Sequence, residues 1–138
     1  EKNIMKEIKL INFDCHKDDD GDLVVAEGNT NNVPFTIARV FNVRVDKGIT
    51  RGCHAHRECT QLLICTNGKV KVICDDGQET SIYILDKPNL GLLIEPGIWS
   101  EQIYIKNNTV LTVLCDSPYN EADYIRNYKD FLKYKGDK

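Results

Sequence analysis

The sequence predicts an all-β fold, and two observations support this class. Short segments rich in β-branched and aromatic residues recur about every ten residues, with turn-forming residues between them. Helical periodicity is nearly absent from most of the chain. About nine strands are expected, at residues 8–13, 23–26, 37–45, 61–65, 70–74, 81–85, 90–94, 103–105 and 110–115. Many short strands at this spacing are typical of a β-sandwich or a β-barrel.

Turn residues mark the ends of these strands. Asn67-Gly68 and Asp76-Gly77 are pairs favoured in two-residue hairpin turns, because both residues tolerate a positive φ. Further breaks are expected at 87–89, 95–97 and 107–108.

The C-terminal segment is the exception to the β pattern. Between residues 121 and 134, apolar residues recur at helical spacing, which predicts a short helix packed on the sheet or on a partner chain. These residues are Tyr124, Ile125, Tyr128, Phe131 and Leu132. The chain contains no repeat, low-complexity segment or linker, so residues 1–138 are expected to form a single domain.

Composition excludes several classes of function. With 18 basic and 21 acidic residues the net charge is −3, and no basic block is present to neutralise a nucleic-acid backbone. No apolar stretch is long enough to cross a membrane, and the charged opening residues do not predict a signal peptide. Three of the six cysteines lie in apolar runs, so free thiols and a cytoplasmic location are expected rather than a disulfide framework.

Two of the three histidines form the pair His54-Ala55-His56. On a strand, residues two apart point to the same face, so both imidazoles converge on one metal or one substrate. The alternative to a functional site is that the two histidines are polar residues that face solvent. His16, which precedes an acidic run, is interpreted as a surface residue.

Arginines suggest an anionic substrate. Arg39 lies in an expected strand and Arg51 precedes the histidine pair, so both are candidates for one cavity mouth. Guanidinium groups suit a diphosphate because they stay charged and donate in parallel. Arg126 is a third candidate. Ordinary surface salt bridges remain the alternative for Arg39, and the polar face of a helix for Arg126.

The spacing around the histidines resembles the cupin superfamily. Gly48, His54, His56, Gln61 and Gly68 match the first cupin motif, except that Gln61 replaces a glutamate. Residues 91–100 resemble the second motif, with Ser100 at the position of its histidine. The resemblance covers residues 37–115 and implies a jelly-roll barrel. Because an amide and a hydroxyl replace two of the four usual metal ligands, the site is expected to hold no metal and to need no cofactor.

A narrower resemblance, to the sugar 3,4-ketoisomerases, extends from about residue 8 to residue 131. It is carried by the following motifs: Arg51-Gly52-Cys53-His54-Ala55-His56, Gln61, residues 91–96, Trp99 with Glu101, residues 121–128, residues 21–24 and residues 33–37. The resemblance implies a metal-independent enzyme that moves the carbonyl of a dTDP-linked 4-keto-6-deoxyglucose from C4 to C3. It also implies a homodimer that exchanges N-terminal strands.

The same resemblance implies roles for individual residues. His56 is expected to be the base at carbon and His54 the proton shuttle, or the two with roles exchanged. The expected substrate-binding residues are Arg39, Arg51, Gln61, Trp99, Ser100, Arg126 and Asp20.

Two of these positions depart from the family. Relatives carry histidine or arginine at the position of Ser100, and arginine or tyrosine at that of Asp20. Both side chains are expected to face the sugar, which bears on the C4 configuration of the product, and galacto is favoured over gluco. Two alternatives stay open: another nucleotide-sugar cupin such as a 3,5-epimerase, and a non-catalytic cupin that binds sugar or metal. The second histidine, His56, speaks against the epimerase.

Overall fold

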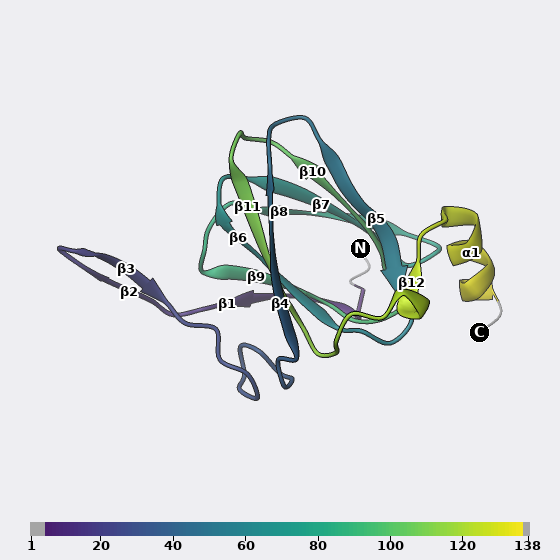
Figure 1. The fold of residues 1–138 in the computed structure, drawn as a ribbon, viewed down its shortest axis with the longest axis horizontal. Coiled ribbons are helices and arrows are strands. Elements are labelled where there is room, and N and C mark those ends of the chain that lie inside the picture. The colour runs from purple at the N-terminus through teal and green to yellow at the C-terminus, as the bar shows by residue number, and fades with distance from the viewer. Residues whose placement is uncertain (1–4, 137–138) are drawn as a thin grey trace.

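The computed structural model describes residues 5–136 as a barrel of two facing sheets, with a hairpin projecting from one side and a helix packed on the other (Figure 1). One sheet has the strand order β1-β9-β6-β11-β4 and the other β12-β5-β10-β7-β8. All named strand pairs are antiparallel. The expected all-β cupin jelly roll with a short C-terminal helix is confirmed.

The first sheet consists of β1 (Ile8–Asn12), β9 (Leu90–Ile94), β6 (Gln61–Asn67), β11 (Thr109–Cys115) and β4 (Arg39–Val45). The second consists of β12 (Tyr124–Ile125), β5 (Thr50–His56), β10 (Trp99–Tyr104), β7 (Val70–Asp75) and β8 (Thr80–Leu85). The projecting hairpin pairs β2 (Cys15–Asp18) with β3 (Gly21–Val24).

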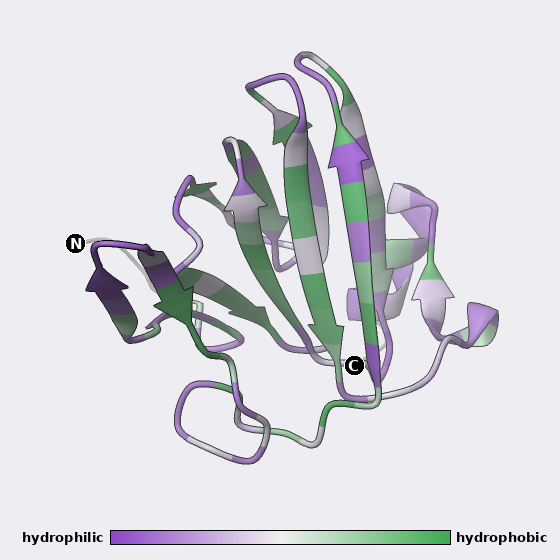
Figure 2. Cartoon of the chain, turned by 60° about the vertical axis from the view of Figure 1, so that its left-hand side comes forward, coloured by the Kyte–Doolittle hydropathy of each residue, from purple (hydrophilic) through white to green (hydrophobic). Residues whose placement is uncertain are grey.

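Apolar side chains pack on both faces of the first sheet. The larger cluster lies between the sheets and includes Leu63, Val72 and Leu111, each at most 1% exposed. A second cluster, including Leu62 and Ile64, covers the outer face. Strand β6 is therefore buried on both faces over its first five residues, which explains its unbroken apolar run. Figure 2 shows that hydrophobic residues gather mainly in the strands, where they alternate with hydrophilic ones in several cases, and that most connecting loops are hydrophilic.

The C-terminal segment differs from the expected helix over 121–134. A 3₁₀ turn covers Glu121–Asp123, β12 pairs with β5 through Tyr124↔His56, and α1 (Tyr128–Gly136) begins only afterwards. Pairing with the open edge of β5 satisfies backbone groups that a helix would have satisfied internally, so tertiary context overrides the local periodicity. In the described residues, no helix has the length and apolar character needed to span a membrane.

Helix α1 packs on the barrel through one fully buried side chain. Phe131 is 0% exposed and lies against Trp99, with 5.8 Å between ring centroids, in a cluster with Ala55 and Ile125. The preceding strand β12 and the outer side of β5 are thereby held by the helix.

We expect Phe131→Ala to lower the free energy of unfolding by about 3 kcal/mol, because it leaves a cavity in this cluster. The matched control is Leu132→Ala, since the neighbouring side chain is 41% exposed. That variant should stay within about 0.5 kcal/mol of the wild type. Urea denaturation of the three proteins measures both values. Equal losses would show that Phe131 does not anchor the helix.

Candidate active site

Strand β5 presents the two histidines on the same side. The ring centroids of His54 and His56 lie 5.0 Å apart in an edge-on arrangement. Ala55 points to the opposite side and is completely buried in the cluster beneath α1. The alternation expected for His-x-His on a strand is therefore present, and it separates a polar inner face from an apolar outer face.

A β-bulge precedes the histidines. Gly52 and Cys53 both have positive φ, 83° and 57°, and the register between β5 and β10 shifts between Ser100 and Glu101. Regular alternation would put Arg51 and His54 on opposite faces, because they are three residues apart. The bulge inserts one residue, and both instead line the same interior cavity.

This cavity has a volume of about 90 Å³ and lies between the two sheets. Its lining combines aliphatic or aromatic residues with a few polar side chains, which is the usual composition of a small-molecule site. The lining residues are Phe41, Val43, Arg51, Gly52, His54, Gln61, Gln102, Leu111 and Val113.

His54 is neutral and has a defined tautomer. Its Nδ1 lies 3.1 Å from the carbonyl oxygen of Gly52, which can only accept, so Nδ1 carries the proton and Nε2 has a free lone pair. Burial, followed by the proximity of His56, lowers the pKa of His54 to about 4.

His56 is paired with a carboxylate. Its Nδ1 donates to Oδ2 of Asp123 at 2.8 Å, and its Nε2 is buried without a hydrogen-bond partner among the described residues. Burial lowers the pKa of His56, and Asp123 opposes that shift. Both imidazoles therefore offer an unprotonated Nε2 at neutral pH.

Tyr124 joins the two histidines to the C-terminal segment. Its ring lies 4.4 Å from His56 and 5.1 Å from His54, centroid to centroid. The guanidinium of Arg126 stacks on the same ring at 4.1 Å. That guanidinium also binds Glu121 through two hydrogen bonds of 2.7 and 2.9 Å, which lower the pKa of Glu121 to about 2.

Three further expected site residues lie near the histidines. The Nε of Arg39 is buried without a partner among residues 5–136, and this side chain interacts with Tyr124 and Cys115. Gln61 is 8% exposed and donates from Nε2 to Sγ of Cys115 at 3.5 Å. Ser100 is 6% exposed and pairs with His54 across β10 and β5.

Two expected site residues lie elsewhere in this chain. Trp99 is buried beneath α1 on the outer side of the sheet, where its Nε1 donates to Glu101 at 2.9 Å. Asp20 lies in the turn of the β2–β3 hairpin, which projects away from the barrel (Figure 1). The structure thus places Arg39 near His56 and Ser100 beside His54, and it places Arg51 and Gln61 with His54 at the interior cavity. Arg126 lies beside Tyr124, and Trp99 and Asp20 are separated from the histidines.

Sequence reasoning missed Asp123 and Tyr124 as parts of the site. Both lie in the segment that was expected to be helical, and its apolar spacing did not indicate that this segment pairs with the histidine strand. The signal was present in the motif at residues 121–128, which carried the family resemblance without an assigned role for either residue.

One group in the described structure has a spacing suited to a metal ion. Ligand atoms of His56, Cys59 and Asp123 all lie within 4.8 Å of one another. This group differs from the cupin ligand set, because it contains neither His54 nor the residues at the two substituted positions. In the group, His56 and Asp123 already bond to each other.

A jelly-roll barrel with paired imidazoles inside it is the arrangement of a cupin. The sequence model of the FdtA family, described as WxcM-like, C-terminal, matches residues 6–136. The chain belongs to this family, and the expected sugar 3,4-ketoisomerase class is confirmed.

Known relatives agree with this assignment over nearly their whole length. A TDP-4-oxo-6-deoxy-alpha-D-glucose-3,4-oxoisomerase from Aneurinibacillus thermoaerophilus is 43% identical over 129 residues, 93% of this chain and 92% of the relative. A variant of the 3,4-ketoisomerase QdtA from Thermoanaerobacterium thermosaccharolyticum, in complex with TDP-4-keto-6-deoxyglucose, superimposes with a TM-score of 0.93 at 38% identity, covering 98% of both chains. WlaRB, a TDP-quinovose 3,4-ketoisomerase from Campylobacter jejuni, gives a TM-score of 0.88 at 35% identity, covering 94% of this chain and 99% of that one.

The low pKa of His54 predicts a pH-dependent contribution to stability. Between about pH 4 and pH 6.5 the unfolded chain binds a proton at this residue and the folded protein does not, so stability falls as pH drops through this window. Between pH 7.5 and pH 5 we expect a loss of about 2 kcal/mol from this residue.

Denaturation at both pH values should therefore show a smaller pH dependence for His54→Asn than for the wild type. His16→Asn is the matched control, because His16 is exposed on the β2–β3 hairpin. If His54→Asn and the wild type lose the same stability, His54 is not held neutral by the fold.

Proposed function

We propose that the protein converts dTDP-4-keto-6-deoxyglucose to a dTDP-linked 3-keto-6-deoxyhexose without a metal ion or other cofactor. The observation that carries the proposal is the pair of neutral imidazoles in the barrel, each with an unprotonated Nε2. The names of the relatives supply the substrate, because they are 3,4-oxoisomerases or 3,4-ketoisomerases of TDP sugars.

The reaction needs two proton transfers at carbon and one between oxygens. A base removes the proton from C3, which is acidic because it lies next to the C4 ketone, and an enediolate with its charge on O4 forms across C3 and C4. The shuttle carries the proton of the O3 hydroxyl to O4, the base returns a proton to C4, and C3 becomes the new ketone. A neutral imidazole suits both kinds of step, because it can accept and donate near neutral pH.

The two imidazoles differ in access and in charge stabilisation. His54 lines the interior cavity, so its Nε2 is the better placed to reach a sugar carbon. His56 has the carboxylate of Asp123 behind it, which stabilises the imidazolium that a shuttle between O3 and O4 forms transiently. These features favour the exchanged assignment, with His54 as the base at carbon and His56 as the shuttle.

Arg39 and Arg51 are proposed to bind the diphosphate. Arg51 is exposed at the interior cavity, and the buried Nε of Arg39 has no partner in the described part of the chain. Arg126 is a weaker candidate for the same role, since Glu121 already neutralises it through two hydrogen bonds. Gln61 and Ser100 are proposed to contact the sugar.

The test is to incubate the protein with dTDP-4-keto-6-deoxyglucose in deuterated water containing a chelator, and to follow the NMR spectrum. We expect a 3-keto product that carries deuterium at C4. A small coupling between H4 and H5 of the product formed in ordinary water would support the proposed galacto configuration. If no 3-keto sugar forms and C3 does not exchange, the proposed reaction is wrong, and a strict metal requirement would refute the metal-free mechanism.

Asparagine variants separate the two histidine roles. Each should lower kcat by at least about 100-fold with little change in affinity for dTDP. Loss of the base at carbon abolishes C3 exchange, whereas loss of the oxygen shuttle leaves slow exchange without product. If deuterium exchange at C3 is retained in His54→Asn and abolished in His56→Asn, then His56 is the base at carbon and His54 is the shuttle.

We further propose that the protein is a cytoplasmic homodimer whose protomers exchange N-terminal strands. The outer face of the β1–β4 sheet supports it, because Val40, which lies beside Leu114 of the outer cluster, is 54% exposed there. On this face a cavity of about 350 Å³ is lined mainly by apolar residues, including Val24, Ile64 and Leu114. Such an exchange would carry Asp20 from one protomer toward the partner's barrel.

Sedimentation equilibrium should therefore give twice the mass of the 15.7 kDa chain. We expect Val40→Asp to shift the equilibrium toward monomer, because it puts a charge on the proposed interface. Ile82→Asp is the matched control, since Ile82 is 58% exposed on β8 of the other sheet. A monomeric wild type would exclude the dimer.

A further inference from the structure

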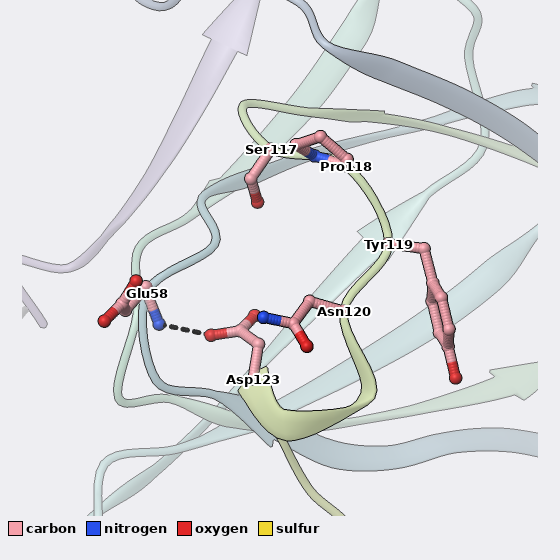
Figure 3. A pocket seen from close by; sticks show the side chains of 6 residues that line it. All are labelled: Glu58, Ser117, Pro118, Tyr119, Asn120 and Asp123. Atoms are coloured by element: carbon pink, nitrogen blue, oxygen red, sulfur yellow. Dashed lines mark hydrogen bonds between the residues drawn. The ribbon is translucent and has the colours of Figure 1, made fainter.

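The carboxylate of Asp123 is held by two donors from different parts of the chain. Its Oδ1 accepts the backbone N–H of Glu58 at 2.6 Å, and its Oδ2 accepts Nδ1 of His56 at 2.8 Å. Figure 3 shows the first bond, with the side chain of Asp123 directed at the backbone of Glu58. The two bonds use one oxygen each, so the carboxylate cannot rotate without losing both.

This arrangement dictates the protonation pattern of His56. A backbone N–H can only donate, so it fixes one carboxylate oxygen in place. The other oxygen then faces Nδ1, which must carry the imidazole proton, and Nε2 is left as an acceptor. The buried Nε2, with no partner among the described residues, is the atom that this pattern makes available.

We propose that Asp123 is the positioning residue that fixes the tautomer and orientation of His56 for proton transfer. The proposal rests on the proposed function, because it assigns His56 a role in that reaction. In this role Asp123 acts through the imidazole of His56 rather than on the substrate directly.

The surroundings of Asp123 keep it ionised. Burial raises its pKa, but the bonds from His56 and the Glu58 amide outweigh burial and hold the pKa below its usual value. A cavity of about 360 Å³, lined by Glu58, Ser117, Pro118, Tyr119, Asn120 and Asp123, lies beside the carboxylate (Figure 3). This cavity lets solvent stabilise the charge from one side.

Other ionisable groups also lie near His56. They come from every element packed against it: His54 from β5, Arg39 from β4, Cys59 from the following loop, and Tyr124 and Arg126 from the C-terminal segment. Desolvation and the two arginines lower the pKa of His56, whereas Asp123 raises it. Among these groups Asp123 therefore supplies the compensating negative charge.

The Asp123→Asn variant tests the proposal directly, because it should reverse the tautomer of His56. An amide has one oxygen and one NH₂ group, and the Glu58 N–H requires the oxygen. The NH₂ group then faces His56 and donates to Nδ1, so the imidazole must carry its proton on Nε2 instead. The substituted site keeps its size and its hydrogen bonds, yet presents a donor where the reaction needs an acceptor.

The matched control is Asp116→Asn. Oδ1 of Asp116 accepts the backbone N–H of Thr60 at 3.0 Å in the same region, and an amide oxygen can replace it there. The control removes a negative charge near the site without altering a contact to either imidazole.

The experiment combines ¹⁵N NMR of histidine-labelled protein with steady-state kinetics. We expect the Nδ1–H tautomer of His56 in the wild type and in Asp116→Asn, and the Nε2–H tautomer in Asp123→Asn. The kcat of Asp123→Asn should fall by about 10²- to 10⁴-fold with KM within about threefold, and the acid limb of its rate profile should move to lower pH.

Three results would overturn the proposal: an Nε2–H tautomer for His56 in the wild type, a kcat within threefold of the wild type in Asp123→Asn, or a loss of kcat without a change of tautomer. The wild-type spectrum decides the first even if the variant does not fold. An inactive wild type with the expected tautomer would refute the proposed function and leave the positioning geometry intact, so the two failures are distinguishable.

Discussion

Strand β5 is held between β10 on one side and β12 on the other, and the candidate site depends on this double pairing. The contact with β12 is only two residues long, but it sets Tyr124 opposite His56 and Ile125 opposite Ala55. Asp123 is thereby placed next to Nδ1 of His56, and the chain continues into α1 on the outer surface. A short edge pairing thus joins the proton-transfer groups to the packing of the helix.

Because side chains alternate along β5, its two faces carry residues with different roles. The inner face presents imidazoles whose burial keeps them neutral, while the outer face anchors the sheet beneath Phe131. The bulge at Gly52–Cys53 breaks this alternation at one position and brings Arg51 to the inner side. The backbone irregularity therefore combines a cation with the histidines on a single strand.

The sequence predicted much of the barrel, because period-two alternation and Asn-Gly or Asp-Gly turns are local signals. It also predicted the histidine pair, for which the alternation of a strand was sufficient. The bulge was not predictable, since Gly52-Cys53 has no distinctive turn signature. The residues around Asp123 were expected in a helix, because apolar spacing cannot reveal that a distant strand edge is open to pairing. The burial of Trp99 outside the cavity follows from the packing of α1. The sequence predicted a helix on the sheet or on a partner chain, but not which strand residues it covers.

The bond between His56 and Asp123 joins residues 67 positions apart in the chain. Strands β1 to β11 all precede Asp123, so the core of the barrel does not include the carboxylate that orients His56. These strands contain both imidazoles but lack the anion that orients one of them. Completion of the site therefore depends on the docking of a short segment as well as on the formation of the core.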